Sequence, residues 1–469
     1  MRWALIGLSL IFVLSWLLLG SQQSCLLANE GQTTHSPPAL SQSEPPTQGV
    51  TEQEILIGMS AAFKGASRSL GIELYRGSMA YFTEINRSGS VRGRKITLKA
   101  YDDGYQPDQA VKNTLKLMLE DRVFLLFDYV GTPTVTRVLP LLKKYENLHF
   151  LLFFPFTGAQ PQREPPYDKL AFNLRASYRQ ETAGLVNNFL AIGRSRIAVF
   201  YQADAYGRSG WVGVREALAK QNEKIVGEAT YARGTKYTES LDRQVAILQE
   251  VNPDAIISVG AYAACAAFIR DARKAGLHIP IANVSFVGSE SMLKLLSETS
   301  KEEGRDYTSA LVNSQVVPSY ENLSMPAVKE YRELMDKYNP MPPADLTEAD
   351  YKPLPYSFVS LEGFLNAKML VATLERLGDH PVRAQIAPTV VGMLCIWPHR
   401  MPRLRSNLKK CKRCSNATMK SANWHDCFCI YPSGKRQLRS LPPRLFLPWT
   451  DIVERKEKRL PLSMSGTPA

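Results

Sequence analysis

Two short loops carry threonine hydroxyls directly after strongly apolar runs. The first reads VGTPT and contains Thr132 and Thr134, and the second reads FTGA and contains Phe156 and Thr157. In the first loop we expect Thr132 to be the N-cap of a helix and Pro133 its first residue. Because a helix start leaves amide groups without partners and favours an anion, a ligand carboxylate could bind there.

The second loop repeats this arrangement. Thr157 offers a hydroxyl, Gly158 lets a ligand approach the backbone, and Phe156 supplies an apolar wall. An alternative is that Thr132 and Thr157 only cap their helices. Their shared position at the ends of neighbouring strands favours contact with a ligand.

A second group of residues lies further along the chain. It comprises Tyr206 in DAYG, Tyr262 in VGAY and Glu290 in VGSE. A carboxylate with aromatic neighbours suits an ammonium group, through a charge-assisted hydrogen bond and a cation–π contact. The alternatives are that Glu290 is a solvated acid in the first turn of a helix and that the tyrosines only pack. Together with the threonine loops, this group predicts a zwitterionic amino acid as the ligand.

The elements that position these loops read as strands alternating with helices. Five continuous apolar runs each end in such a loop: FLLFDYVGTPT, HFLLFFPFTGA, RIAVFYQADAYG, DAIISVGAYAA and VSFVGSE. Such runs are typical of parallel strands buried on both faces, and the alternation with helices predicts an α/β fold with doubly wound sheets. There are too many strands for one sheet. We therefore expect two lobes, with residues 51–172 in lobe 1, 173–316 in lobe 2 and 317–380 returning to lobe 1, joined by hinge crossings at 173–177 and 313–319.

The order and spacing of the motifs resemble those of a known family. The motifs ILIGMSAAFKG, YDDGYQPDQAV, VGTPT, FTGA, QADAYG, VGAY, FVGSE and SLEGFLNAKMLV follow one another as in the periplasmic substrate-binding proteins of ABC importers. The group resembled is the leucine/isoleucine/valine-binding family, a type I clamshell of two Rossmann-like lobes joined by a hinge.

The resemblance implies an exported protein that captures an amino acid or similar small polar metabolite between its lobes. It implies delivery to the membrane permease and ATPase of an ABC importer. It also implies that Tyr206, Tyr262 and Glu290 hold the α-amino group of the ligand. The family's first loop usually supplies a Ser or Thr, whereas this chain has AAFKG, so Phe63 is a candidate lining residue only.

Signals for an enzyme are few. The chain has no GxGxxG, GxSxG or HExxH motif, no Walker loop, and six scattered histidines. Asp102 and Asp103 are adjacent, so at a strand end they point to opposite sides and do not form a catalytic pair. We therefore predict a binding protein without catalytic residues, metal or cofactor. An enzyme on the same fold and the ligand-sensing ectodomain of a signalling system are the alternatives.

The N-terminus has the pattern of an export signal. Arg2 precedes an uncharged run from Trp3 to Gly20, and residues 29–50 are rich in Ser, Thr, Pro and Gln. We expect residues 1–28 to be a signal peptide or membrane anchor and 29–50 to be a linker. Cleavage after Ala28, lipid attachment at Cys25 and an uncleaved anchor are all open. Each predicts a periplasmic or otherwise extracytoplasmic protein.

Residues 381–469 form a basic tail unlike the family. They hold 17 Lys and Arg against 4 Asp and Glu, which accounts for the whole net charge of +13, and five of the seven cysteines. We interpret them as the product of a change of reading frame near residues 380–392. A zinc site at Cys411, Cys414, Cys427 and Cys429 is an alternative. Binding of anionic lipid or nucleic acid is another, although we predict no nucleic-acid partner.

Overall fold

The computed structural model describes residues 47–395 of the 469-residue chain, and side chains as far as residue 393. The predictions made for the signal peptide, for Cys25, for most of the linker and for the four tail cysteines lie outside the described residues. No helix within residues 47–395 is both long enough and apolar enough to cross a membrane.

Lobe 1 is built on a five-stranded sheet in the order β2-β1-β3-β4-β5, with every pairing parallel. Its strands are β1 (Glu54–Ala61), β2 (Lys95–Asp102), β3 (Leu125–Phe127), β4 (Leu152–Phe153) and β5 (Ala171–Phe172). Its helices are α1 (Arg68–Arg87), α2 (Pro107–Leu115), which continues into a π-helical turn (Lys116–Glu120), and α3 (Thr132–Lys144), with the later α9 (Pro326–Tyr338), α10 (Phe358–Leu377) and α11 (Arg383–Cys395).

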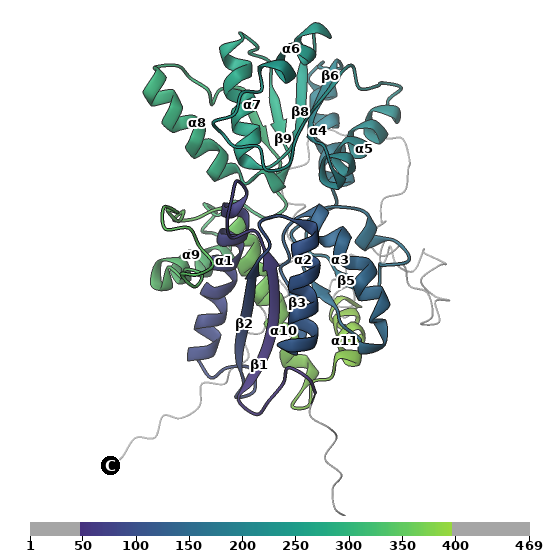
Figure 1. The fold of residues 1–469 in the computed structure, drawn as a ribbon, viewed down its shortest axis with the longest axis vertical. Coiled ribbons are helices and arrows are strands. Elements are labelled where there is room, and N and C mark those ends of the chain that lie inside the picture. Colours follow the sequence, from purple (N-terminus) through teal and green to yellow (C-terminus); the bar gives the residue numbers. More distant parts are fainter. Residues whose placement is uncertain (1–46, 396–469) are drawn as a thin grey trace, which may run out of the picture. The chain divides into compact units, whose positions relative to one another are not determined.

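Lobe 2 contains a second five-stranded parallel sheet, in the order β10-β9-β8-β6-β7. Its strands are β6 (Ile197–Gln202), β7 (Glu228–Tyr231), β8 (Ala255–Val259), β9 (Ile281–Asn283) and β10 (Leu311–Asn313). Its helices are α4 (Tyr178–Ala191), α5 (Ala205–Ala219), α6 (Asp242–Glu250), α7 (Tyr262–Lys274) and α8 (Ser289–Glu303). Figure 1 shows α4 to α8 around this sheet.

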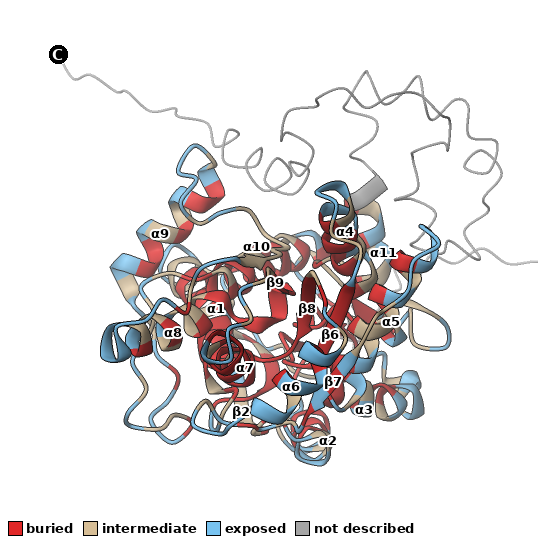
Figure 2. Cartoon of the chain, turned by 90° about the horizontal axis from the view of Figure 1, so that it is seen from above, coloured by how far each residue is buried: buried red, intermediate tan, exposed pale blue. Residues whose placement is uncertain are grey.

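The central strands are buried because they are apolar along their whole length. Every residue of β8 and β9 is buried, and so are five of the six residues of β6. Figure 2 shows β6, β8 and β9 buried among the helices of lobe 2. Continuous burial is expected for parallel strands with helices on both faces. The predicted α/β fold with two lobes and parallel sheets is confirmed.

Lobe 1 is completed by a segment that returns from the far side of lobe 2. Helices α1 and α10 lie side by side, although residues 88–357 separate them in sequence (Figure 1). Two glycines allow this close approach. A Cβ at Gly77 would lie 1.7 Å from the carbonyl oxygen of Ser360, and a Cβ at Gly363 would lie 2.1 Å from that of Leu74. No larger residue fits at either position without moving a backbone.

The chain passes from the first sheet to the second between β5 and β6, and it leaves the second sheet after β10. One boundary differs. The predicted tail begins at residue 381, but α11 covers Arg383–Cys395 and packs Ile386, Val390 and Met393 into the core that contains α10. Arg383 also donates to the carbonyl oxygens of Phe124 (2.6 Å) and Val123 (2.7 Å). Residues 383–395 are therefore part of the fold. Their apolar residues could have predicted this helix, but the basic composition of the whole segment concealed it.

Candidate functional site

The YDDG block shapes the edge of lobe 1 that faces lobe 2. The Asp102 carboxylate accepts hydrogen bonds from the amides of Phe63 (2.8 Å), Lys64 (3.2 Å) and Gly104 (3.0 Å). It therefore ties the loop after β2 to the loop after β1. Phe63 itself is buried and packs edge-on against Tyr75 of α1, with ring centroids 5.9 Å apart.

Asp103 works separately from Asp102, as the sequence predicted. Its carboxylate accepts hydrogen bonds from the Ser60 hydroxyl (2.8 Å) and from the Tyr105 amide (2.9 Å). Burial raises the pKa of Asp103 to about 7. The bond to the Tyr105 amide fixes the backbone that carries the Tyr105 side chain.

Five buried aromatic rings from both lobes meet around Phe286, and we call them the aromatic cluster. Phe286 lies 6.1 Å from Tyr105, 5.2 Å from Phe156 and 4.6 Å from Tyr206 between ring centroids, and Tyr178 lies 5.2 Å from Tyr206. Tyr105 and Phe156 belong to lobe 1 and the other three rings to lobe 2. A ligand held between the lobes at this point would contact aromatic surface from both sides.

The two predicted threonines of lobe 1 lie together beside this cluster. The Thr132 and Thr157 hydroxyls are 2.6 Å apart and both residues are buried. The Thr157 hydroxyl also accepts from the Ala159 amide at 3.2 Å. The pair therefore offers hydroxyl groups next to the first turn of α3, where an anion is favoured.

The predicted N-cap of α3 was wrong by one residue. Gly131 is the N-cap, Thr132 is the first helical residue and Pro133 the second. Gly131 has φ +102°, and a Cβ there would lie 2.1 Å from the Tyr105 ring. The turn needs glycine for both reasons, so a threonine could not occupy it.

Thr134 has a different role from Thr132. Its hydroxyl donates to the carbonyl oxygens of Val130 and Gly131, the latter at 2.9 Å, and the residue is fully buried. Because its only hydrogen is used by the main chain, Thr134 can meet a ligand only as an acceptor.

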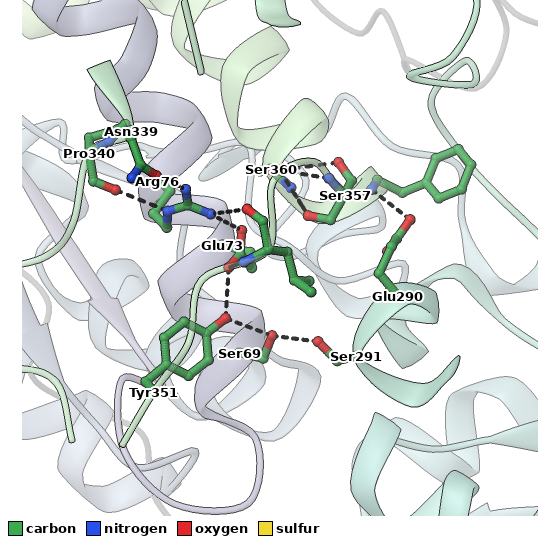
Figure 3. Close-up of polar contacts among 12 residues, drawn as sticks. Ser69, Glu73, Arg76, Glu290, Ser291, Asn339, Pro340, Tyr351, Ser357 and Ser360 are labelled. Atoms are coloured by element: carbon green, nitrogen blue, oxygen red, sulfur yellow. Dashed lines mark hydrogen bonds and ion pairs between the residues drawn. The ribbon is translucent and has the colours of Figure 1, made fainter. Parts of the chain in front are cut away.

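Tyr206 joins the aromatic cluster, but Tyr262 and Glu290 make their hydrogen bonds elsewhere. The Tyr206 hydroxyl donates to the Gly260 carbonyl oxygen at 3.3 Å. The Tyr262 hydroxyl accepts from the Ser69 amide at 3.4 Å. Glu290 accepts from the Phe358 amide at 3.2 Å, at the first turn of α10 (Figure 3). Burial raises the pKa of Glu290, and its bond to that amide opposes the rise.

A chain of hydrogen bonds joins α8 of lobe 2 to α1 of lobe 1 (Figure 3), and we call it the Ser69 chain. The Ser69 hydroxyl lies 2.6 Å from that of Ser291 and 3.1 Å from that of Tyr351. The Tyr351 hydroxyl donates to Glu73 at 2.7 Å, and Glu73 accepts from Arg76 at 2.7 Å. Glu73 and Arg76 each expose 1% of their side chains, so this ion pair is buried inside lobe 1.

The most informative residue missed by the sequence analysis is Arg175, on the crossing between β5 and α4. Its guanidinium lies 4.3 Å from the centre of the Phe156 ring and donates to the Ser285 hydroxyl. Glu362 and Glu181 lie 3.7 Å and 3.9 Å away. Burial raises the pKa of Glu362 to about 7, and Arg175 opposes that rise. The sequence signal was an arginine placed within a predicted hinge crossing.

Comparison with known proteins identifies the family. A family model described as periplasmic binding protein matches residues 54–411. The chain belongs to the periplasmic binding protein family. Its two parallel-sheet lobes and its relatives place it among the type I proteins of the leucine/isoleucine/valine-binding group.

Two curated relatives show how far the sequence of this chain has diverged within the family. An amino acid binding protein of Pseudomonas aeruginosa is 23% identical over 228 residues, which cover 48% of this chain and 58% of that protein. The Leu/Ile/Val-binding protein of Escherichia coli K12 is 22% identical over 249 residues, which cover 53% of this chain and 66% of that protein. The chain therefore spans less than two thirds of the length of each.

Solved structures show the same fold. A possible leucine/isoleucine/valine-binding protein from Rhodopirellula baltica is 30% identical with a TM-score of 0.63, and the match covers 74% of this chain and 86% of that one. A branched-chain amino acid transporter protein from Thermus thermophilus with bound valine is 15% identical with a TM-score of 0.61, over 73% and 84%. A fatty acid transporter substrate-binding protein from Thermomonospora curvata is 20% identical with a TM-score of 0.60, over 74% and 82%. Because the last two are at most 20% identical, they show only that the fold is shared.

Proposed function

We propose that this protein is an exported solute-binding protein. It captures an amino acid or similar small polar metabolite between its lobes and delivers it to the permease and ATPase of an ABC importer. One observation carries the proposal: the aromatic cluster draws its rings from both lobes and lies beside the Thr132–Thr157 pair. A site divided in this way is complete only when the lobes approach each other.

The arrangement supports capture without covalent chemistry. The first turn of α3 and the Thr132 and Thr157 hydroxyls would receive a carboxylate, because unpaired helical amides and hydroxyl donors favour an anion. Tyr206 and Phe286 of lobe 2 would then close over the rest of the ligand. Binding energy gained only in the closed arrangement shifts the population of the lobes toward closure.

The names of the relatives support this function at the level of class. Curated relatives are named as amino acid and Leu/Ile/Val-binding proteins, and one related structure holds valine. Another is named for fatty acids, so the fold serves ligands of different chemistry. The side chains of this chain must therefore decide its own ligand.

A thermal-shift screen against amino acids and other small carboxylates tests the proposal directly. A ligand that binds only the folded state raises the melting temperature. We expect a hit whose affinity in calorimetry falls in a Thr132→Val/Thr157→Val variant. Thr136→Val is the matched control, since that hydroxyl lies on the same helix and donates to the Thr132 carbonyl oxygen at 2.7 Å. Chemical conversion of the bound compound, seen by mass spectrometry, would contradict a binding protein.

A further inference from the structure

Arg175 is a fully buried cation with unused hydrogen-bond donors. It exposes 4% of its surface, and its Nε and Nη1 atoms make no hydrogen bond to any residue in the described part of the chain. Among residues 47–395, Nη2 alone has a hydrogen-bond partner, the Ser285 hydroxyl. Three N–H bonds of a buried guanidinium therefore have no acceptor, which is strongly unfavourable unless something else supplies one.

The neighbouring carboxylates do not satisfy these donors. Glu362 lies 3.7 Å from Nε, and Glu181 lies 3.9 Å from Nη2, both beyond hydrogen-bond distance. One oxygen of Glu181 instead accepts from the Ser285 amide (2.9 Å) and the Ser314 hydroxyl (3.0 Å). Arg163 adds a second positive charge, since it donates to the Arg175 carbonyl oxygen at 2.9 Å. Two guanidinium groups and two carboxylates thus meet at this point, while Nε and Nη1 of Arg175 make no hydrogen bond to the described residues.

The surroundings of these donors are aromatic. Phe156 lies under the guanidinium at 4.3 Å. Tyr178, three residues along the chain, packs against Tyr206, which packs against Phe286. The Tyr178 side chain is buried and interacts with the side chain of Thr132. A molecule that reached Arg175 would thus lay its apolar part against rings from both lobes.

We propose that the ligand is an aromatic acid, that Arg175 is a further anchor for its carboxylate beside the Thr132–Thr157 pair, and that the aromatic cluster selects its ring. This inference rests on the proposed function and names the ligand class of the same site. The carboxylate of the ligand supplies the acceptor that the Nε and Nη1 donors lack. Binding at Arg175 and the aromatic cluster does not require an α-ammonium group, since the carboxylate and the ring of the ligand make these contacts. Only one oxygen of Glu290, Oε1, accepts from the Phe358 amide.

Four probes test the ligand class on the full-length protein by calorimetry: 3-phenylpropionate, 3-phenylpropionamide, phenylalanine and leucine. The first two have the same ring and chain length and differ in charge. We expect 3-phenylpropionate to bind at least about tenfold more tightly than its amide, because hydrogen bonds to charged groups are the stronger ones. We expect phenylalanine to have no advantage over 3-phenylpropionate. Equal binding of the acid and the amide would overturn the inference, and so would leucine binding better than 3-phenylpropionate.

Substitutions of Arg175 test its role in binding the carboxylate. Arg175→Gln should reduce 3-phenylpropionate binding at least about tenfold and leave 3-phenylpropionamide binding within about threefold. Arg175→Lys should recover part of the loss, because lysine keeps the charge without the planar fork. Arg179→Gln is the matched control: Arg179 also lies near the start of α4, but it is 40% exposed and pairs with Glu164 and Glu216.

The outcomes separate this inference from the proposed function. Binding of leucine or phenylalanine without binding of 3-phenylpropionate would overturn the aromatic acid and leave a solute-binding protein. Binding of 3-phenylpropionate that survives Arg175→Gln would overturn the role of Arg175 alone. If no probe binds and the broader screen also yields no ligand, both proposals fail. The comparison of acid with amide uses the natural protein, so it decides the ligand class even if an Arg175 variant does not fold.

Discussion

The hydroxyl of Ser69 on α1 lies 2.6 Å from the hydroxyl of Ser291 on α8, so a hydrogen bond joins lobe 1 directly to lobe 2. The bond lies in the Ser69 chain, which continues through Tyr351 to the buried Glu73–Arg76 pair. Hydrogen bonds therefore connect the contact between the lobes to a buried ion pair of lobe 1. An interaction present only when the lobes meet stabilises the closed arrangement relative to the open one.

Ser69→Ala should weaken ligand binding without unfolding the protein. Loss of one hydrogen bond costs about 0.5–1.5 kcal/mol, so the dissociation constant should rise roughly 2- to 12-fold. Calorimetry with a hit from the screen measures the change. Ser88→Ala is the control, since Ser88 is exposed at the end of the same helix and bonds only to carbonyl oxygens of that helix. Unchanged affinity in Ser69→Ala would show that the Ser69 chain does not contribute to closure.

Glu73→Gln should destabilise the fold. The substitution leaves Arg76 buried without its counter-charge, and breaking a buried pair typically costs about 3–5 kcal/mol. Urea denaturation measures the free energy of unfolding. Glu333→Gln is the control, because its partner Lys329 lies 3.7 Å away with both side chains more than 60% exposed, and such pairs contribute at most about 1 kcal/mol. Similar losses in the two variants would contradict the assigned role of burial.

Most of the fold, but only part of the candidate site, could be predicted from sequence patterns. The strands were predictable because parallel strands buried on both faces must be apolar throughout, as β8 is. Thr132, Phe156, Thr157 and Tyr206 could be predicted as candidates because their loops directly follow such strands, and their contact with a ligand stays a prediction. Arg175 was not predicted as a candidate, because a buried cation on a segment between lobes leaves no periodic pattern in the sequence. The hydrogen bond from the Phe358 amide to Glu290 was not predictable, because it joins residues 68 apart in sequence, and the contact of Glu290 with a ligand stays a prediction.

Stability should fall as pH rises through the titration of Asp103. Burial raises its pKa from 3.8 to about 7, so between these values the folded protein keeps a proton that the unfolded chain has released. The free energy of unfolding then decreases as pH rises across this window. The stability that the retained proton gives the folded state is lost above about pH 7. Urea denaturation at pH 5 and pH 8 should show a loss about 1–3 kcal/mol larger in the natural protein than in Asp103→Asn. Equal losses would contradict the raised pKa.

Truncation should distinguish α11 from the rest of the basic tail. A chain ending after residue 380 lacks Arg383 and the apolar side chains of Ile386, Val390 and Met393, so it uncovers part of the core that contains α10. We expect it to melt at a lower temperature and to aggregate more than a chain ending after residue 395. Calorimetric scans and light scattering measure the two effects. Equal stability of the two truncated chains would show that α11 adds nothing to lobe 1.

The central claim is that a small ligand is held between the lobes and that the lobes close on it. Small-angle X-ray scattering of the protein with and without a saturating hit from the screen tests this most directly. We predict a smaller radius of gyration with ligand, and no change in the Thr132→Val/Thr157→Val variant at the same ligand concentration. A ligand that binds the natural protein in calorimetry but leaves its radius of gyration unchanged would contradict the account.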